Sequence, residues 1–230
     1  EWIEKWSTRV NKCIGLELDE GMFNICKEKN LDVLLSDPLD FLKDIKDDSV
    51  SLISMFHVIE HITHDNLILL LTECHRVLTQ KGLLLMETPS IDNLLVSSKN
   101  FYLDHTHINH INPDGVKFFL DKIGYCSSEY FYIHGGPLQN SDHFKLTRVL
   151  NGIAQDVLFV STKSSESSKN IFENMNTWIK SIDTSIPLLQ AAKEHDLYLL
   201  NYFNDNKNNY DKLYSLINDN KNNYDKLYSL

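Results

Sequence analysis

The sequence predicts an α/β fold: a doubly wound, Rossmann-like, mostly parallel sheet with an antiparallel edge strand, followed by a helical C-terminal tail. Three observations support this fold. Short apolar runs of strand length alternate with helical periodicity from residue 12 to residue 123. Two further apolar runs near residues 125–133 and 155–162 are typical of a closing antiparallel pair. Beyond Ser164 the composition shifts to helix formers with many Asn, Asp, Lys and Tyr residues.

The elements follow from local patterns. Apolar runs predict the first four strands at residues 12–18, 31–35, 50–56 and 82–88. Period-3.6 patterns predict the intervening helices at residues 20–29, 38–46, 65–79, 91–98 and 114–123. Gly124 has the position after a helix that favours glycine. Trp2 to Trp6 resembles the body of a helix without a preceding cap, so we expect the chain to start within an element.

The organisation of the chain changes near residue 164, and we place a domain boundary there. Residues 1–163 are expected to form one domain, 164–170 a polar linker and 171–230 the tail. Asn204–Leu216 returns as Asn218–Leu230, a period of fourteen residues or two heptads. Phe203, Tyr210 and Ile217 fall seven apart, which favours a coiled coil. The many asparagines favour the alternative, a disordered tail.

Composition excludes several classes of function. The formal net charge of −10 argues against nucleic acid as a partner, because such binding neutralises phosphates with Lys and Arg. The four cysteines form no Cys-x-x-Cys pair and are expected to be reduced thiols. No leader pattern is present, and the apolar stretches fall far short of the roughly 20 residues that span a bilayer. We therefore expect a soluble cytoplasmic protein without a transmembrane segment.

Two acids follow successive predicted strands. Glu17 ends the first strand, where a carboxylate can accept both hydroxyls of a ribose. Asp37 lies just past the second strand, where a carboxylate could accept a hydrogen bond from an exocyclic amine such as that of adenine. Each observation is weak alone: Glu17 could be a solvated side chain, and Asp37 could form an Asx turn before Pro38. Together they indicate a nucleoside site.

Several motifs in combination carry a resemblance. They are Gly15-Leu16-Glu17, Ser36-Asp37, Phe56-His57-Val58-Ile59-Glu60-His61, Leu78–Gly82 and Glu87-Thr88-Pro89. Over roughly residues 1–135 the chain resembles class I S-adenosylmethionine-dependent methyltransferases. Phe101-Tyr102-Leu103-Asp104-His105-Thr106-His107 is similar to the Phe-Tyr-x-Asp-Pro-Thr-His signature of methyltransferases encoded with O-antigen and capsular polysaccharide enzymes.

The resemblance implies S-adenosylmethionine as the cofactor and assigns residues to it. Glu17 would bind the ribose and Asp37 would face the adenine, with Leu39 packed beside the adenine ring. Phe56 and His57 would line the cofactor after the next strand. The acceptor would be a hydroxyl or phosphate of a surface glycan or its precursor.

Methyl transfer to a hydroxyl requires in-line alignment and removal of a proton. His107, oriented by Asp104 three residues earlier, is the preferred base, and His61 is the second candidate. Two other functions stay open: a small-molecule, quinol-type O-methyltransferase, and a non-catalytic scaffold for glycan assembly. The tail could support self-association or contact a glycosyltransferase.

A metal is an alternative that the same histidines raise. His57, Glu60 and His61 fall on one helical turn and resemble a Glu-x-x-Glu-His ligand set, with His105 and His107 able to converge. The interpretation that we adopt is that Glu60 and His61 cap the next helix, so no metal ligand is assigned.

The chain also departs from the family pattern. None of the eight glycines lies in a Gly-x-Gly pattern, so the family's glycine-rich loop and first strand are missing, and we expect a truncated domain that binds the cofactor weakly. His105 and His110 stand where the family has prolines. The sequence therefore does not predict whether the loop that contains them is rigid.

Overall fold

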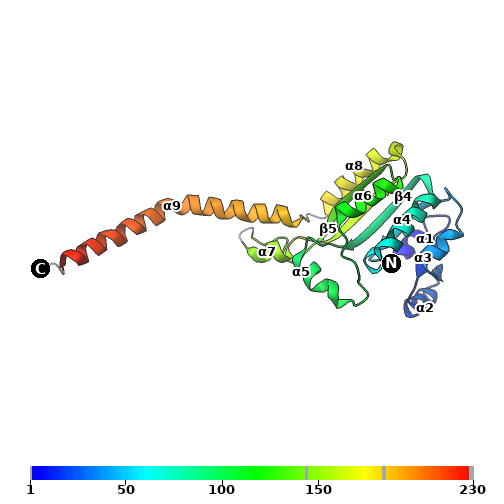
Figure 1. Ribbon diagram of the computed structural model, residues 1–230, viewed down its shortest axis with the longest axis horizontal. Helices are drawn as coiled ribbons and strands as arrows, with labels where there is room; N and C mark the ends of the chain where they lie inside the picture. The colour runs from blue at the N-terminus through cyan, green and yellow to red at the C-terminus, as the bar shows by residue number, and fades with distance from the viewer. Residues whose placement is uncertain (1, 143–144, 183–184, 228–230) are drawn as a thin grey trace.

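The computed structural model describes residues 2–142, 145–182 and 185–227 and has an α/β, Rossmann-like fold (Figure 1). The larger sheet has the strand order β3-β4-β6-β5, with β3 at Val50–Phe56, β4 at Leu78–Pro89, β6 at Ala154–Thr162 and β5 at Ser127–Gly135. A second sheet pairs β1 (Gly15–Glu17) with β2 (Val33–Leu35) in parallel. β3 and β4 are also parallel, whereas β6 runs antiparallel to both of its neighbours. The predicted alternation and antiparallel closing pair are confirmed.

Short polar residues set the starts of several helices. The side chains of Asp19, Asp37, Asn93 and Asn112 accept hydrogen bonds from backbone amides in the first turns of the helices that follow them. The described helices before α8 are α1 Trp2–Ser7, α2 Glu20–Glu28, α3 Pro38–Lys43, α4 His64–Val77, α5 Leu94–Ser98, α6 Pro113–Ile123 and α7 Leu146–Asn151. Two 3₁₀ turns, η1 (Ile59–His61) and η2 (Asn100–Leu103), lie next to the strand ends. Gly124 ends α6 with φ of 116°, as predicted.

The main core lies between α4, α6 and the larger sheet. The predicted apolar face of α4 is buried, and it packs with Leu84 and Met86 of β4 and with Phe159 of β6. Its buried members are Leu67, Leu70, Leu71, Cys74 and Val77. Because this layer holds β3 and β4 in place, it also fixes the loops that follow their carboxyl ends.

Residues 164–170 are not a linker. Helix α8 spans Ser165–Ile182, so the polar stretch forms the beginning of a helix. Its apolar side chains pack on the sheet face formed by Ile133, Leu158 and Val160. The packed residues of α8 are Ile171, Phe172, Met175 and Ile179. The serines and charges predicted a loop, but a helix whose apolar face is buried tolerates a polar first turn.

The tail is helical rather than disordered over its described part. Helix α9 spans Leu188–Leu227 and begins beside α7, where Arg148 Nη1 lies 3.1 Å from Glu194 Oε2. Its C-terminal part extends away from the rest of the molecule (Figure 1). Within the described ranges, no helix has the combined length and apolarity that crossing a membrane requires.

The core assignment makes a prediction about stability. Leu71 is 0% exposed and Leu69, on the other side of the same helix, is 55% exposed. We expect Leu71→Ala to lower the free energy of unfolding by about 2–5 kcal/mol, because it removes buried contacts and leaves a cavity. Leu69→Ala should change it by less than about 0.5 kcal/mol. Urea unfolding of both variants measures this difference, and equal losses would place the core elsewhere.

Candidate active site

Glu17 and Asp37 lie at one edge of the smaller sheet. β1 and β2 are parallel, with Glu17 opposite Leu35, and the Ser36 amide donates to the Glu17 carbonyl at 3.1 Å. The Glu17 Oε1 atom accepts from the amides of Leu18 and Asp19 at 2.8 and 2.9 Å. The two acids therefore follow adjacent strand ends, as predicted from their spacing.

Asp37 has the role that an Asx turn would give it, since its Oδ1 accepts from the amides of Leu39 and Asp40 at the start of α3. Each acid thus uses one carboxylate oxygen on backbone amides. No hydrogen bond from a described residue reaches Glu17 Oε2 or Asp37 Oδ2. These oxygens fit the donors of a nucleoside, namely ribose hydroxyls and an exocyclic amine. Leu39 is half-buried and packs against the main core.

Phe56 and His57 follow the carboxyl end of β3. The Phe56 ring contacts the Trp2 ring edge-on, with 5.0 Å between centroids, so α1 packs over this strand end. His57 adopts a positive φ of 52°, a region that side chains other than glycine rarely enter. Its amide donates to the Glu87 carbonyl at 2.9 Å, which continues the pairing with β4 beyond the strand.

The His57 imidazole lies between two carboxylates. Nδ1 is 3.2 Å from Glu60 Oε1, and Nε2 is 3.3 Å from Glu87 Oε1. Hydrogen bonds to Glu60 and then Glu87 outweigh partial burial and raise the pKa of His57 to about 10. This ring is therefore expected to carry a positive charge near neutral pH.

Glu60 does not cap the next helix, contrary to the expectation from sequence. Its side chain is fully buried, and Thr88 Oγ1 donates to its Oε2 at 3.0 Å. Helix α4 instead begins after Thr63, which makes no side-chain capping bond. Glu60 is thus an interior carboxylate that binds His57 and Thr88 across two strand ends.

Asp156 and His134 complete the cluster around Glu87. His134 Nδ1 is 2.9 Å from Asp156 Oδ2 and 3.7 Å from Glu87 Oε1. Burial is the largest cause of the raised pKa of Asp156, and the bond from His134 opposes it. His134 itself is 56% exposed, so it contacts these acids from the surface.

His61, Asp104 and His107 lie together, as predicted. The rings of His61 and His107 are 4.6 Å apart between centroids. The Thr106 hydroxyl donates to Asp104 Oδ1 at 2.6 Å and lies 2.8 Å from His61 Nδ1. Because that hydroxyl has one hydrogen, His61 Nδ1 is the donor in the second bond. The Thr106 bonds are also the main cause that lowers the pKa of Asp104.

Asp104 does not orient His107 by a hydrogen bond, since the closest approach to His107 Nε2 is 3.9 Å. His107 Nδ1 lies 2.7 Å from the Phe101 carbonyl oxygen, which can only accept. The proton therefore sits on Nδ1, and Nε2 is the basic nitrogen. Nε2 is 4.0 Å from Glu60 Oε1.

Aromatic packing fixes the loop that lacks the two prolines. Phe101 is 4% exposed, and its ring stacks on His110 with 3.8 Å between centroids and contacts His107 at 4.6 Å. The amides of Ile108 and Asn109 both donate to the Glu60 carbonyl, at 3.0 and 3.1 Å. The loop is therefore anchored by a buried ring and by two backbone bonds.

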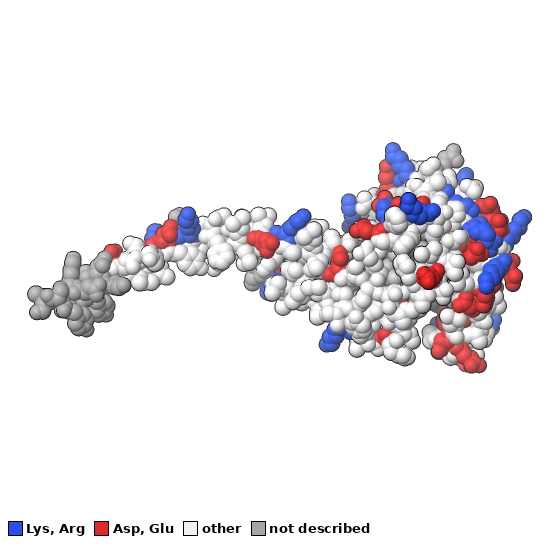
Figure 2. Space-filling model, viewed as in Figure 1, with Lys and Arg blue, Asp and Glu red and all other residues white. Residues whose placement is uncertain are grey.

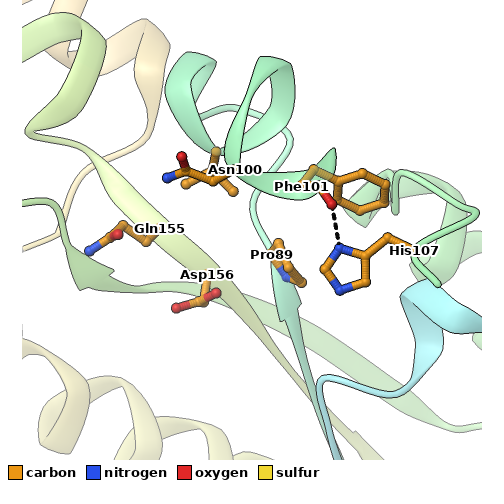
Figure 3. Close-up of a pocket in the computed structure, with 7 residues that line it drawn as sticks. Pro89, Asn100, Phe101, His107, Gln155 and Asp156 are labelled. Atoms are coloured by element: carbon orange, nitrogen blue, oxygen red, sulfur yellow. Dashed lines mark hydrogen bonds between the residues drawn. The ribbon is translucent and has the colours of Figure 1, made fainter. Parts of the chain in front are cut away.

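A small pocket opens between this loop and the start of β6. It holds about 160 Å³ and is lined by Pro89, Val96, Asn100, Phe101, His107, Gln155 and Asp156. Figure 3 shows His107 and Phe101 on one side of this pocket and Gln155 and Asp156 on the other. It is smaller than the roughly 300 Å³ or more of a typical ligand site, so it fits only one group of an acceptor.

The predicted residues thus form two groups, Glu17 with Asp37 and His61 with Asp104 and His107. Across the described residues, no hydrogen bond or ion pair joins the two groups directly. Sequence reasoning did not assign Glu87 or Asp156 a role in the site. Glu87 could have been found from its position at a strand end, whereas Asp156 begins an antiparallel strand and gives no such signal.

Comparison with known proteins agrees with this fold. Residues 1–86 match the model of a family described as "Methyltransferase domain". A SAM-dependent methyltransferase from Archaeoglobus fulgidus is 23% identical, with a TM-score of 0.63 over 70% of this chain and 80% of that one. One from Thermotoga maritima is 18% identical, with a TM-score of 0.52 over 70% and 78%. No curated protein matches the sequence.

A structure with a bound ligand has the same fold. Haemonchus contortus phosphoethanolamine N-methyltransferase 2, in complex with S-adenosyl-L-methionine, is 15% identical, with a TM-score of 0.52 over 70% of this chain and 46% of that one. The region that matches the family model contains Glu17, Asp37, the β3 end and most of β4. The family model matches only the first part of the chain, and these solved structures share its fold.

Proposed function

We propose that this chain is an S-adenosylmethionine-dependent methyltransferase that acts on a hydroxyl or phosphate of a surface glycan or its precursor, with His107 as the base. The observation that carries the chemistry is the fixed tautomer of His107: the Phe101 carbonyl holds the proton on Nδ1 and leaves Nε2 basic at the pocket. The glycan rests on the resemblance of Phe101–His107 to the polysaccharide-associated branch. The proposal includes a cytoplasmic location, where a soluble precursor would be the acceptor.

S-adenosylmethionine, when bound, supplies the methyl group as a sulfonium. His107 Nε2 would take the proton of an acceptor hydroxyl as its oxygen attacks the methyl carbon and the carbon–sulfur bond breaks. The carboxylates of Glu60 and Asp104, at 4.0 and 3.9 Å, would stabilise the resulting imidazolium. An anionic phosphate needs no base, and His107 would then only position it. His61, which is hydrogen-bonded to Thr106, would be the second candidate for the base.

The cofactor would be held mainly by Glu17 and Asp37, through the carboxylate oxygens that bind no described residue. Phe56 would line the site beside Trp2, and Leu39 would contact the adenine from its half-buried position on α3. His57 would contribute its backbone, because Glu60 and Glu87 engage its imidazole.

We also propose that α9 self-associates as a coiled coil. In its described part the side chains of Phe203, Tyr210, Leu213 and Ile217 are more than half exposed although they share a heptad stripe. Figure 2 shows a largely uncharged surface along this helix. Asn-rich helices are unstable alone in water, and a second copy would cover the stripe.

The cofactor assignment predicts selective losses of affinity. Glu17→Gln and Asp37→Asn keep an oxygen for the local backbone bonds but remove the charge. We expect each to weaken S-adenosylmethionine binding about tenfold or more, as for the loss of one charge-assisted hydrogen bond. Calorimetric titration measures the ratio to the unaltered chain. The matched controls Glu20→Gln and Asp40→Asn, on the following helices, should bind normally, and equal effects in all four variants would contradict the assignment.

The role of His107 predicts a defect in turnover rather than in binding. We expect His107→Gln to lower kcat about 10²- to 10⁴-fold while the affinity for S-adenosylmethionine stays unchanged. The measurement is transfer of labelled methyl to the best acceptor among nucleotide sugars, lipid-linked oligosaccharides and quinol-type phenols. His105→Gln, from the same loop, serves as the control. A phenol as the best acceptor would favour the small-molecule alternative, and cofactor binding without transfer to any class would favour the scaffold.

Self-association of α9 can be tested by sedimentation. We expect the unaltered chain to associate at micromolar concentration and Ile217→Asp to be monomeric, because a charge in the stripe opposes burial. Ser215→Asp lies on the opposite face of the same helix and should associate normally. A monomeric unaltered chain would disprove the coiled coil.

A further inference from the structure

A second cluster of ligating side chains lies beyond the proposed base. One ligand atom each from His57, Glu87 and Asp156 can be chosen so that all three lie within 4.8 Å of one another. The ligands of one ion bound at about 2.1 Å stand about 3–4 Å apart, so small side-chain movements would close the set. We infer that these three residues bind a divalent transition-metal cation.

Two of the imidazoles around Glu87 belong to residues with a left-handed backbone conformation. Only four described residues other than glycine have positive φ: Asn30, Asp48, His57 and His134. Histidine, like Asn and Asp, enters this region more often than most other side chains. Both histidines contact Glu87, His57 from the end of β3 and His134 from β5. Two of the four residues thus place their imidazoles around one carboxylate.

The charges also fit a cation. The side chains of Glu87 and Asp156 are only 14% and 15% exposed, and His134 contacts both of them. Two largely buried carboxylates at one point are stable when they are paired or coordinate a metal. The cation would compensate both acids directly, with His134 beside it as a further potential ligand.

The surroundings of His57 match those of a metal ligand. A ligating histidine commonly donates its other ring N–H to a carboxylate, which fixes the tautomer. Here Nε2 faces Glu87 while Nδ1 lies 3.2 Å from the buried Glu60. One imidazole with two carboxylates suits Zn²⁺, Mn²⁺ or Fe²⁺ better than Mg²⁺, which prefers oxygen ligands and water.

The site borders the pocket, because Asp156 belongs to both. A cation there could bind an oxygen of the acceptor opposite His107. The inference concerns metal binding alone and does not rest on the proposed acceptor, so it can be tested without methyl transfer.

The test is a titration of the metal-stripped protein, residues 1–230, with Co²⁺ and Zn²⁺. We expect one equivalent of either ion to bind and the visible spectrum of Co²⁺ to show nitrogen and oxygen ligands. His57→Asn and Asp156→Asn should weaken binding at least about tenfold. Asparagine tolerates positive φ, so the first variant keeps the backbone of position 57. Circular dichroism of each variant verifies folding.

His61→Gln is the matched control, because Glu60, His61 and His107 form the other group with suitable geometry. It should bind Co²⁺ as the unaltered chain does. The absence of saturable binding would overturn the inference. His57 and His134 would then be the residues that compensate the charges of Glu87 and Asp156. Loss of binding in His61→Gln but not in His57→Asn would also overturn it, since the ion would then occupy the other group.

Discussion

The buried carboxylate of Glu60 is the constraint on which the site depends. Its side chain has no exposed surface, so every polar contact must come from the protein. Thr88 supplies one bond from the end of β4 and His57 another from the end of β3. Its backbone carbonyl accepts from the amides of Ile108 and Asn109. One residue therefore ties two strand ends to the loop that carries His107, and removing its side chain would leave the buried Thr88 hydroxyl without its acceptor.

This arrangement explains how a loop rich in histidine can hold a fixed geometry without its two prolines. Prolines would stiffen the loop by restricting φ in the unfolded chain as well. Here rigidity comes from contacts made only in the folded state: the buried Phe101 ring against His110, and the Phe101 carbonyl on His107. Such a loop is ordered only while the core beneath it stays folded. The position of His107 therefore depends on the stability of the sheet.

The fold could be predicted from the sequence where burial dominates, and the site only in part. The strand at Val50–Phe56 has the predicted bounds because an apolar run ends at polar residues on both sides. The linker prediction failed because the first turn of α8 is polar, while its packing face begins only at Ile171. Glu17, Asp37 and His107 were recognisable because they follow strand ends or a motif. Asp156 and His134 were not, because their roles depend on strand direction and on a left-handed backbone, which no local pattern encodes.

The two groups of titratable side chains share one oxygen. Glu60 Oε1 lies 3.2 Å from His57 Nδ1 and 4.0 Å from His107 Nε2. A cation on His57 Nε2 would confine the remaining proton of that ring to Nδ1, where it donates to Glu60. The proposed cation site and the loop that carries His107 thus meet at a single buried acid, Glu60.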